Sequence, residues 1–164
     1  MKLRIAVGAL MLSASGFVGI LLSEGYSDTA IIPVQGDVPT IGFGTTGGVK
    51  PGDRIAPPQA VLRAHRDVEE FEDALKACVK VPLHQHEYDA FVSLAYNIGS
   101  GAFCSSTLVR KLNARDYIGA CLEILRWDKF KGRPLRGLTL RREREYRQCV
   151  GVQAGLSPMI SQIG

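Results

Sequence analysis

The sequence predicts a small α+β protein with two lobes, a mostly helical body and a small β-hairpin lobe near the N-terminus. Two observations lead to this class. Apolar residues recur at helical spacing through most of the chain beyond residue 56, whereas residues 31–48 are rich in β-branched residues, Gly and Pro. At 164 residues, the chain has the size of a single domain.

The individual elements follow from local patterns. Residues 31–48 contain short apolar runs separated by Gly-Asp and Gly-Gly, which is typical of a small hairpin or meander. A helix from Glu87 to Ile98 places Phe91 and Leu94 on one face, so we expect it to be the buried central helix. Other helices are expected from Ala56 to about Val79, Ser106 to Leu112, Asp116 to about Trp127, and Thr139 to about Val150, with a basic loop from Lys129 to Gly137.

The N-terminus has the pattern of an export segment. Lys2 and Arg4 precede an uncharged run of nineteen residues, Ile5 to Ser23, which Glu24 closes. Such a run is long enough to span a bilayer, but nearly half of it is Gly, Ala or Ser, so its insertion would be reversible. A cleaved signal peptide and a buried helix of a cytosolic domain are the alternatives. We favour an uncleaved anchor, because cleavage after residue 15 would remove the start of the helix that carries Glu24.

Charge and cysteine content restrict the partners. The net charge of +4 and the pI near 9.0 favour an anionic partner, such as a membrane surface or an acidic wall polymer. The sequence has neither zinc-finger spacing nor an aromatic-interleaved basic platform, so no nucleic acid is expected. The four cysteines lack C-x-x-C spacing, which favours disulfides over a metal site. His65, His84 and His86 are interpreted as surface residues, and no cofactor is expected.

Three sequence blocks occur in a characteristic order. The first is Leu22–Tyr26 followed by Pro39–Gly44, the second is Ala90–Gly99 followed by Phe103 and Ser106–Leu108, and the third is Arg126–Trp127 followed by Gly137–Leu138 and Arg141–Glu143. Together they resemble the phage lysozyme family, glycoside hydrolase family 24, found in T-even and lambdoid phages. The resemblance covers nearly the whole chain after the apolar segment. That segment makes the chain similar to the signal-arrest-release subgroup, whose members stay tethered in the inner membrane until it depolarises.

This resemblance implies a lysozyme-like fold and an endolysin. The expected reaction is hydrolysis of the β-1,4 linkage between N-acetylmuramic acid and N-acetylglucosamine in peptidoglycan, which causes host cell lysis. Residues 1–23 would be the membrane segment and residues 24–164 the catalytic domain. We expect a monomer that is first tethered, inactive, in the host inner membrane through residues 5–23 and then released into the periplasm. A lytic transglycosylase and a catalytically inactive wall-binding module are the alternatives.

Glycoside hydrolysis requires a proton donor for the leaving oxygen and a second group that directs water or attacks the sugar. Glu24 lies where an apolar helix meets the β element, and partial burial there would favour its protonated form, so we assign it as the general acid. The family places an Asp or Cys nine residues after this Glu, but here that position is Pro33. We therefore expect Asp37 to activate water, with Asp28 as the other candidate. Thr40 resembles the family Thr and would hold that water.

The resemblance also implies that the reaction inverts the anomeric centre and that Tyr96, Asn97 and Thr107 line the sugar groove. Core and capping roles explain these three almost equally well. A basic tail follows, interpreted either as attraction to an anionic surface or as a solvated helix with Arg/Glu pairs; its arginines are Arg133, Arg136, Arg141, Arg142, Arg144 and Arg147. Cys121 and Cys149 lie on neighbouring helices and are expected to pair. Pairing of Cys78 with Cys104 is a weaker expectation.

Overall fold

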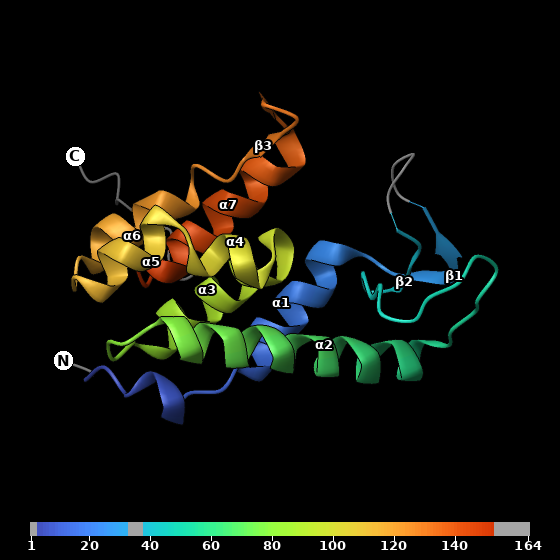
Figure 1. Ribbon diagram of the computed structural model, residues 1–164, viewed down its shortest axis with the longest axis horizontal. Helices are drawn as coiled ribbons and strands as arrows, with labels where there is room; N and C mark the ends of the chain where they lie inside the picture. The colour runs from blue at the N-terminus through green and yellow to red at the C-terminus, as the bar shows by residue number, and fades with distance from the viewer. Residues whose placement is uncertain (1–2, 33–37, 153–164) are drawn as a thin grey trace, which may run out of the picture.

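The computed structural model describes residues 3–32 and 38–152. It is mostly helical, with a two-stranded hairpin at one end (Figure 1). The helices are α1 (Ala14–Glu24), α2 (Pro57–Cys78), α3 (Gln85–Ile98), α4 (Ser100–Cys104), α5 (Thr107–Asn113), α6 (Tyr117–Ile124) and α7 (Arg136–Cys149), preceded by a 3-10 turn, Val7–Ala9. The strands are β1 (Ser27–Ile31), β2 (Thr40–Gly42), β3 (Lys129–Phe130) and β4 (Arg133–Pro134). The α+β class is confirmed.

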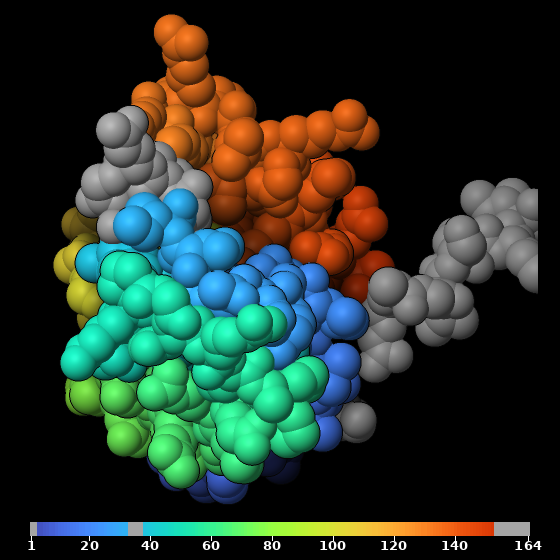
Figure 2. All heavy atoms as spheres, turned by 90° about the vertical axis from the view of Figure 1, so that its right-hand side faces the viewer, coloured from blue at the N-terminus to red at the C-terminus, as the bar shows by residue number. Residues whose placement is uncertain are grey.

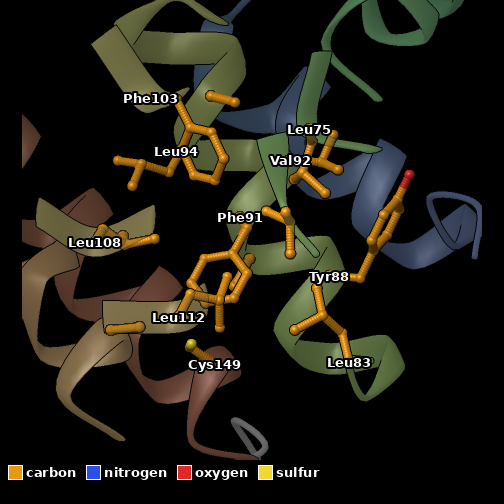
Figure 3. Packing of buried hydrophobic residues seen from close by; sticks show 14 of the residues in the cluster. Leu75, Leu83, Tyr88, Phe91, Val92, Leu94, Phe103, Leu108, Leu112 and Cys149 are labelled. Atoms are coloured by element: carbon orange, nitrogen blue, oxygen red, sulfur yellow. The ribbon is translucent and has the colours of Figure 1, made fainter. Parts of the chain in front are cut away.

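Helix α3 is the centre of the helical body. Phe91 and Leu94 are fully buried on it, and Phe103, Leu108 and Leu112 from α4 and α5 pack against the same region (Figure 3). The helix ends at Gly99, whose φ of 90° is a conformation that favours glycine. The expectation that this helix is central and buried is therefore confirmed.

Helix α2 joins the two lobes, because its N-terminal half underlies the hairpin and its C-terminal half packs on the body (Figure 1). Pro57 occupies its first turn, where no backbone N–H is needed. Thr45, which follows the hairpin and is buried, donates a 2.5 Å hydrogen bond from Oγ1 to Asp67 of α2. Gly42 has a φ of 65°, and a Cβ atom there would come within 3.0 Å of Ala60 Cβ. The hairpin can therefore lie directly on the helix.

Strands β1 and β2 are antiparallel, with Ser27 opposite Gly42 and Ile31 opposite Thr40. The predicted β region began at residue 31, so its start was placed too late: the first strand ends there instead. The first strand begins earlier than predicted because helix α1 ends at Glu24, and Gly25, with a φ of 72°, turns the chain directly into β1.

The apolar run from Ile5 to Ser23 is divided in this structure at Ser13, which caps the N-terminus of α1. Among the described residues, no helix combines the length and the hydrophobicity needed to cross a membrane. The segment expected as a loop, residues 129–137, contains the short β3–β4 hairpin, in which Lys131 has a φ of 48°. Helix α4 was not predicted separately.

Two disulfides connect the helices of the body. One joins Cys121 of α6 to Cys149 of α7, with Cα atoms 5.7 Å apart, and this is the pairing expected from the sequence. The other joins Cys78, at the end of α2, to Cys104 of α4. Each closes a loop of fewer than thirty residues, with sequence separations of 28 and 26. The cross-links therefore hold α2, α4, α6 and α7, whereas α1 carries none.

Candidate active site

Glu24 is the last residue of α1 and lies between the helical body and the hairpin lobe. Its side chain is 18% exposed. On the hairpin side it approaches Gly44, where a Cβ atom would lie 3.5 Å from Glu24 Oε2 and the φ is 88°. Figure 2 looks onto this end of the molecule: the hairpin lobe, in light blue and cyan, lies in front, and the segment around β3 and β4, in orange, projects above it. The carboxyl group is thus partly enclosed but accessible.

Arg141 of α7 provides the strongest contact of this carboxyl group. Arg141 Nη1 donates to Glu24 Oε1 at 2.6 Å, although the two residues are 117 positions apart. The guanidinium is only 7% exposed, and it also donates to Glu145 Oε1 at 3.1 Å and to the Ser93 carbonyl at 3.3 Å. Because it is fixed on three sides, Arg141 holds the Glu24 carboxyl group in one position with a charge-assisted hydrogen bond.

The sequence interpretation of the basic tail as a solvated helix is wrong for two of its arginines. Arg141 and Arg142 are buried, and both pair with the buried Glu145. Burial raises the pKa of Glu145 and lowers the pKa of Arg142, since low-polarity surroundings disfavour both charged forms. Arg142 Nη2 donates to Asn97 Oδ1 at 3.1 Å, and Arg142 Nε lies 2.9 Å from Glu145 Oε2. Two arginines and one glutamate therefore form a charged layer behind Glu24.

A cavity of about 190 Å³ adjoins this layer, between α1, α3 and α7. Ser23, Ser93, Arg141 and Glu145 are among the residues that line it. Two members of the charged layer, Arg141 and Glu145, therefore border a space large enough for water.

The hairpin carries the candidates for the second catalytic group. Asp28 on β1 is exposed, and its carboxylate accepts hydrogen bonds from Thr29 Oγ1 at 3.0 Å and Arg54 Nη2 at 2.9 Å. These hydrogen bonds, with that from Thr29 the larger influence, lower the pKa of Asp28. Asp37, the preferred candidate, lies outside the described residues. Thr40 opens β2, and its Oγ1 donates to the Ile31 carbonyl at 3.3 Å.

The three candidate groove residues differ in their surroundings. Tyr96 on α3 donates its hydroxyl to the Phe43 carbonyl at 2.9 Å, which joins the body to the hairpin one residue from Gly44. Burial raises the pKa of Tyr96, so its phenol stays protonated and remains a donor. Asn97 is exposed and is held by Arg142. Thr107 begins α5 and accepts from Arg110 Nη2 at 2.7 Å.

The structure therefore brings three of the candidates into one region. Tyr96 binds Phe43, which is next to Gly44, the residue that Glu24 approaches. Asn97 is held by Arg142 of the charged layer behind Glu24. None of the contacts described above joins Thr107 to that region. Sequence reasoning proposed Glu24 as a site residue but did not predict its pairing with Arg141, which it counted only as part of the basic tail. The spacing Arg141–Glu145 was a usable signal, because a four-residue Arg/Glu pair on a helix can be buried as well as solvated.

The chain matches the family model described as phage lysozyme over residues 22–145. It is 36% identical to the endolysin of Salmonella phage P22 over 141 residues, which are 83% of this chain and 95% of that protein. It is also 32% identical to the SAR-endolysin of Pseudomonas phage phiKMV over 151 residues, 90% of this chain and 93% of the relative.

A solved structure similar in fold is the endolysin of Escherichia coli O157:H7 phage FAHEc1, with a TM-score of 0.77 and 34% sequence identity. The superposition covers 88% of this chain and 96% of the other. The family match over residues 22–145 includes β1, β2, helices α2 to α6 and most of α7, and both Glu24 and Arg141 fall within it.

Proposed function

The chain belongs to the phage lysozyme family and is a muramidase that acts on bacterial peptidoglycan, and on this premise we propose that Glu24 is its general acid. The observation that carries the proposal is the position of the Glu24 carboxyl group. It is partly enclosed between the two lobes and fixed by Arg141 at 2.6 Å, and its other oxygen faces Gly44. A proton donor must be held in a fixed position beside the leaving oxygen, and the fixed, partly enclosed position of this carboxyl group supports the assignment.

The reaction cleaves the β-1,4 bond between N-acetylmuramic acid and N-acetylglucosamine. Glu24 gives its proton to the glycosidic oxygen as that bond breaks, and a water molecule attacks the anomeric carbon from the opposite face. We assign activation of this water to Asp37, which takes up its proton, and its orientation to Thr40. Inversion of the anomeric centre follows from this direct displacement, and a further proton exchange with solvent resets both carboxyl groups.

Asp28 is the less suitable second group. Its carboxylate is already paired with Arg54, and the hydrogen bonds from Thr29 and Arg54 lower its pKa, which weakens it as a base. The position of Thr40 at the start of β2 supports the assignment of Asp37, which lies three residues before Thr40 in the sequence. Tyr96 and Asn97 are proposed to contact the sugar near Glu24, and Thr107 to contact it farther along the groove.

The biological role is that of an endolysin in host cell lysis. We propose that residues 1–23 tether the chain, as a monomer, to the inner membrane, and that release delivers the uncleaved chain, with residues 24–164 as its catalytic domain, to the periplasm as the active enzyme. Two observations support this. Basic residues precede an apolar run rich in Gly, Ala and Ser, and a similar protein bears the name SAR-endolysin. In the arrangement described here, residues 14–24 of that region form α1.

The test is release of reducing ends from purified peptidoglycan. Glu24→Gln should lower kcat by about 10²–10⁴-fold, because it removes the proton donor while keeping the shape of the side chain. Asp37→Asn should give a loss of the same order and Asp28→Asn a small one. The matched control is Glu70→Gln, an exposed carboxylate on α2 that is expected to leave the rate unchanged.

Each other outcome would point to a different mechanism or activity. Loss in Asp28→Asn but not in Asp37→Asn would move the second role to β1. Loss only in Glu24→Gln, with a 1,6-anhydro product, would indicate a lytic transglycosylase. Binding to peptidoglycan without release of reducing ends by the wild-type chain would indicate a wall-binding module.

A further inference from the structure

Three acidic side chains on α2 and α3 are buried although most acidic residues in proteins are exposed. Glu72, Glu87 and Asp89 are 7%, 3% and 4% exposed. Burial of a carboxylate is costly unless partners compensate its charge and donate hydrogen bonds to it. The catalytic arrangement uses none of these three residues, so their partners have to be explained separately.

All three receive hydrogen bonds from the N-terminal segment, residues 4–13. Arg4 binds Glu87 with two hydrogen bonds, of 3.0 and 2.7 Å, and its guanidinium lies 3.5 Å from the centre of the Tyr117 ring. The backbone N–H of Leu12 donates to Glu72 Oε1 at 2.8 Å. Ser13 donates twice to Asp89, from its backbone N–H at 3.0 Å and from Oγ at 2.6 Å.

Two side chains outside the N-terminal segment, Tyr88 and Gln85, also donate hydrogen bonds to these carboxylates. Glu72 also accepts from the Tyr88 hydroxyl at 2.6 Å, and Gln85 Nε2 donates to both Asp89 at 2.8 Å and the Met11 carbonyl at 2.7 Å. The segment also exchanges two backbone hydrogen bonds between Ile5 and Leu83, of 2.7 and 2.8 Å. The N-terminal segment is thus bound along its length by side chains and backbone of α2, α3 and the loop between them.

We propose that Glu72, Glu87 and Asp89 form a docking site for residues 4–13, and that Asp89 is a positioning residue for Glu24. Ser13 is both the ligand of Asp89 and the N-cap of α1, where its Oγ accepts from the Gly16 N–H at 3.0 Å. From this cap the helix runs about 16 Å to Glu24 at 1.5 Å per residue. Fixing the start of such a short, stiff helix fixes the position of its last side chain.

Apolar packing alone does not hold α1 in place. Only Gly16 and Ile20 are buried among its eleven residues. Gly16 is the point of closest approach: a Cβ atom there would lie 3.1 Å from Asp89 Cγ and 2.8 Å from Leu12 Cδ1. The absence of a side chain at residue 16 therefore lets the helix reach Asp89. Gly19, one turn farther along, has open space at the same position.

Docking excludes insertion of the same segment into a bilayer. Leu12, Ser13 and Gly16 all lie within the apolar run from Ile5 to Ser23, so these residues cannot bind Asp89 and Glu72 while they span a membrane. In this step the inference rests on the tethered state proposed above. The three carboxylates would then be hydrated in the tethered chain and would capture the segment once it leaves the membrane, which assembles α1 and brings Glu24 to Arg141.

The full-length Gly16→Ala and Gly19→Ala chains are a matched pair for the test. Each substitution adds one methyl group to α1, so helix propensity and membrane affinity change equally. Only the methyl group at residue 16 meets Asp89. For Gly16→Ala we expect amide hydrogen exchange in residues 14–24 to become at least about tenfold faster. We also expect kcat on peptidoglycan to fall about tenfold with KM within about twofold, and more chain to stay with the membrane fraction. Gly19→Ala should match the wild type.

A second pair separates positioning from general loss of stability. Asp89→Ala should reproduce the behaviour of Gly16→Ala, and Asp89→Asn, which keeps an acceptor for the Ser13 N–H, should recover most of the rate. Asp116→Ala is the control, because Asp116 caps α6 by accepting from the Gly119 N–H at 2.9 Å and contacts no part of the N-terminal segment in the described structure. It should leave exchange in α1 and kcat unchanged.

Equal exchange rates and equal kcat for Gly16→Ala and Gly19→Ala would overturn the proposal. A fall in kcat without faster exchange in α1 would overturn it as well. If the wild-type chain never associates with membranes, the proposed tether fails, and exchange in the purified chain still decides whether the docking site fixes α1. If the wild-type chain releases no reducing ends, the proposed reaction fails, and the same exchange measurement still applies.

Discussion

Helix α1 is more hydrophobic than helix α3, yet it is the less buried of the two. Helix α1 contains one charged residue, yet Leu22 and Val18 on it are 78% and 51% exposed. Helix α3 contains Glu87 and Asp89, yet eight of its fourteen residues are buried. Hydrophobicity alone therefore does not decide which helix lies in the core. The apolar character of α1 exceeds what its place in this fold requires, which fits a segment that also resides in a bilayer.

The two helices are also held by different interactions. Helix α3 packs among apolar side chains from α2, α4 and α5, in a body that two disulfides cross-link. Helix α1 contributes one fully buried side chain, Ile20, to that core, and polar contacts hold both of its ends, Ser13 on Asp89 and Glu24 on Arg141. Apolar packing is lost only with the whole core, whereas two polar contacts can break while the body stays folded. The comparison predicts a stable body and a separable α1.

The largest effect expected from this difference is on stability. Phe91→Ala should lower the free energy of unfolding by about 3–5 kcal/mol, since Phe91 is fully buried in α3. Leu22→Ala should change it by less than about 0.5 kcal/mol, because Leu22 is largely exposed on α1. Denaturant unfolding followed by circular dichroism measures both. A loss above about 1 kcal/mol for Leu22→Ala would mean that α1 is as much part of the core as α3.

A smaller effect is expected from the disulfide between α6 and α7. Replacing both Cys121 and Cys149 by Ala should lower the free energy of unfolding by roughly 2–4 kcal/mol, because the unfolded chain gains the freedom that the 28-residue link removes. Hydrogen exchange should become faster in α6 and α7 while residues 14–24 keep their wild-type rates. Faster exchange in α1 as well would show that the body and α1 open together, which would break the comparison.

Much of the body could be predicted from sequence because its signals are local. Asp116 and Ser106 are capping residues directly before apolar residues at helical spacing, and they are the N-caps of α6 and α5, whereas Pro57 begins α2. The division of the N-terminal run at Ser13 could not be predicted in this way. It depends on Asp89, 76 residues away, which no property of the run itself reveals.

The same contrast between local signals and distant contacts applies to the candidate site. Glu24 could be proposed as a candidate from sequence because the motif around it is contiguous. Arg141 could not be assigned, because its partner lies 117 residues earlier and the local composition of α7 favours a solvated helix. The charge pairs of α7 are compatible with exposure and with burial, and only the packing of α1 and α3 against that helix distinguishes the two. Contacts between distant segments thus account for what sequence reasoning missed at both ends of α1.

The smallest expected effect concerns acid stability of the body. The hydrogen bond from Lys111 Nζ to Glu123 at 2.7 Å, assisted by Arg126, lowers the pKa of Glu123 and ties α5 to α6. A carboxyl group whose pKa is lowered by folding stabilises the protein above its unfolded pKa, and that contribution is lost as pH falls through the lowered value. Glu123→Gln should therefore be less stable than wild type at neutral pH, by below about 1 kcal/mol. The gap should narrow progressively as the pH falls below the unfolded pKa of a glutamate, about 4.3. Thermal unfolding of both chains over this range measures the gap. A gap that persists in acid would mean that Glu123 stabilises the α5–α6 contact through packing and not through its charge.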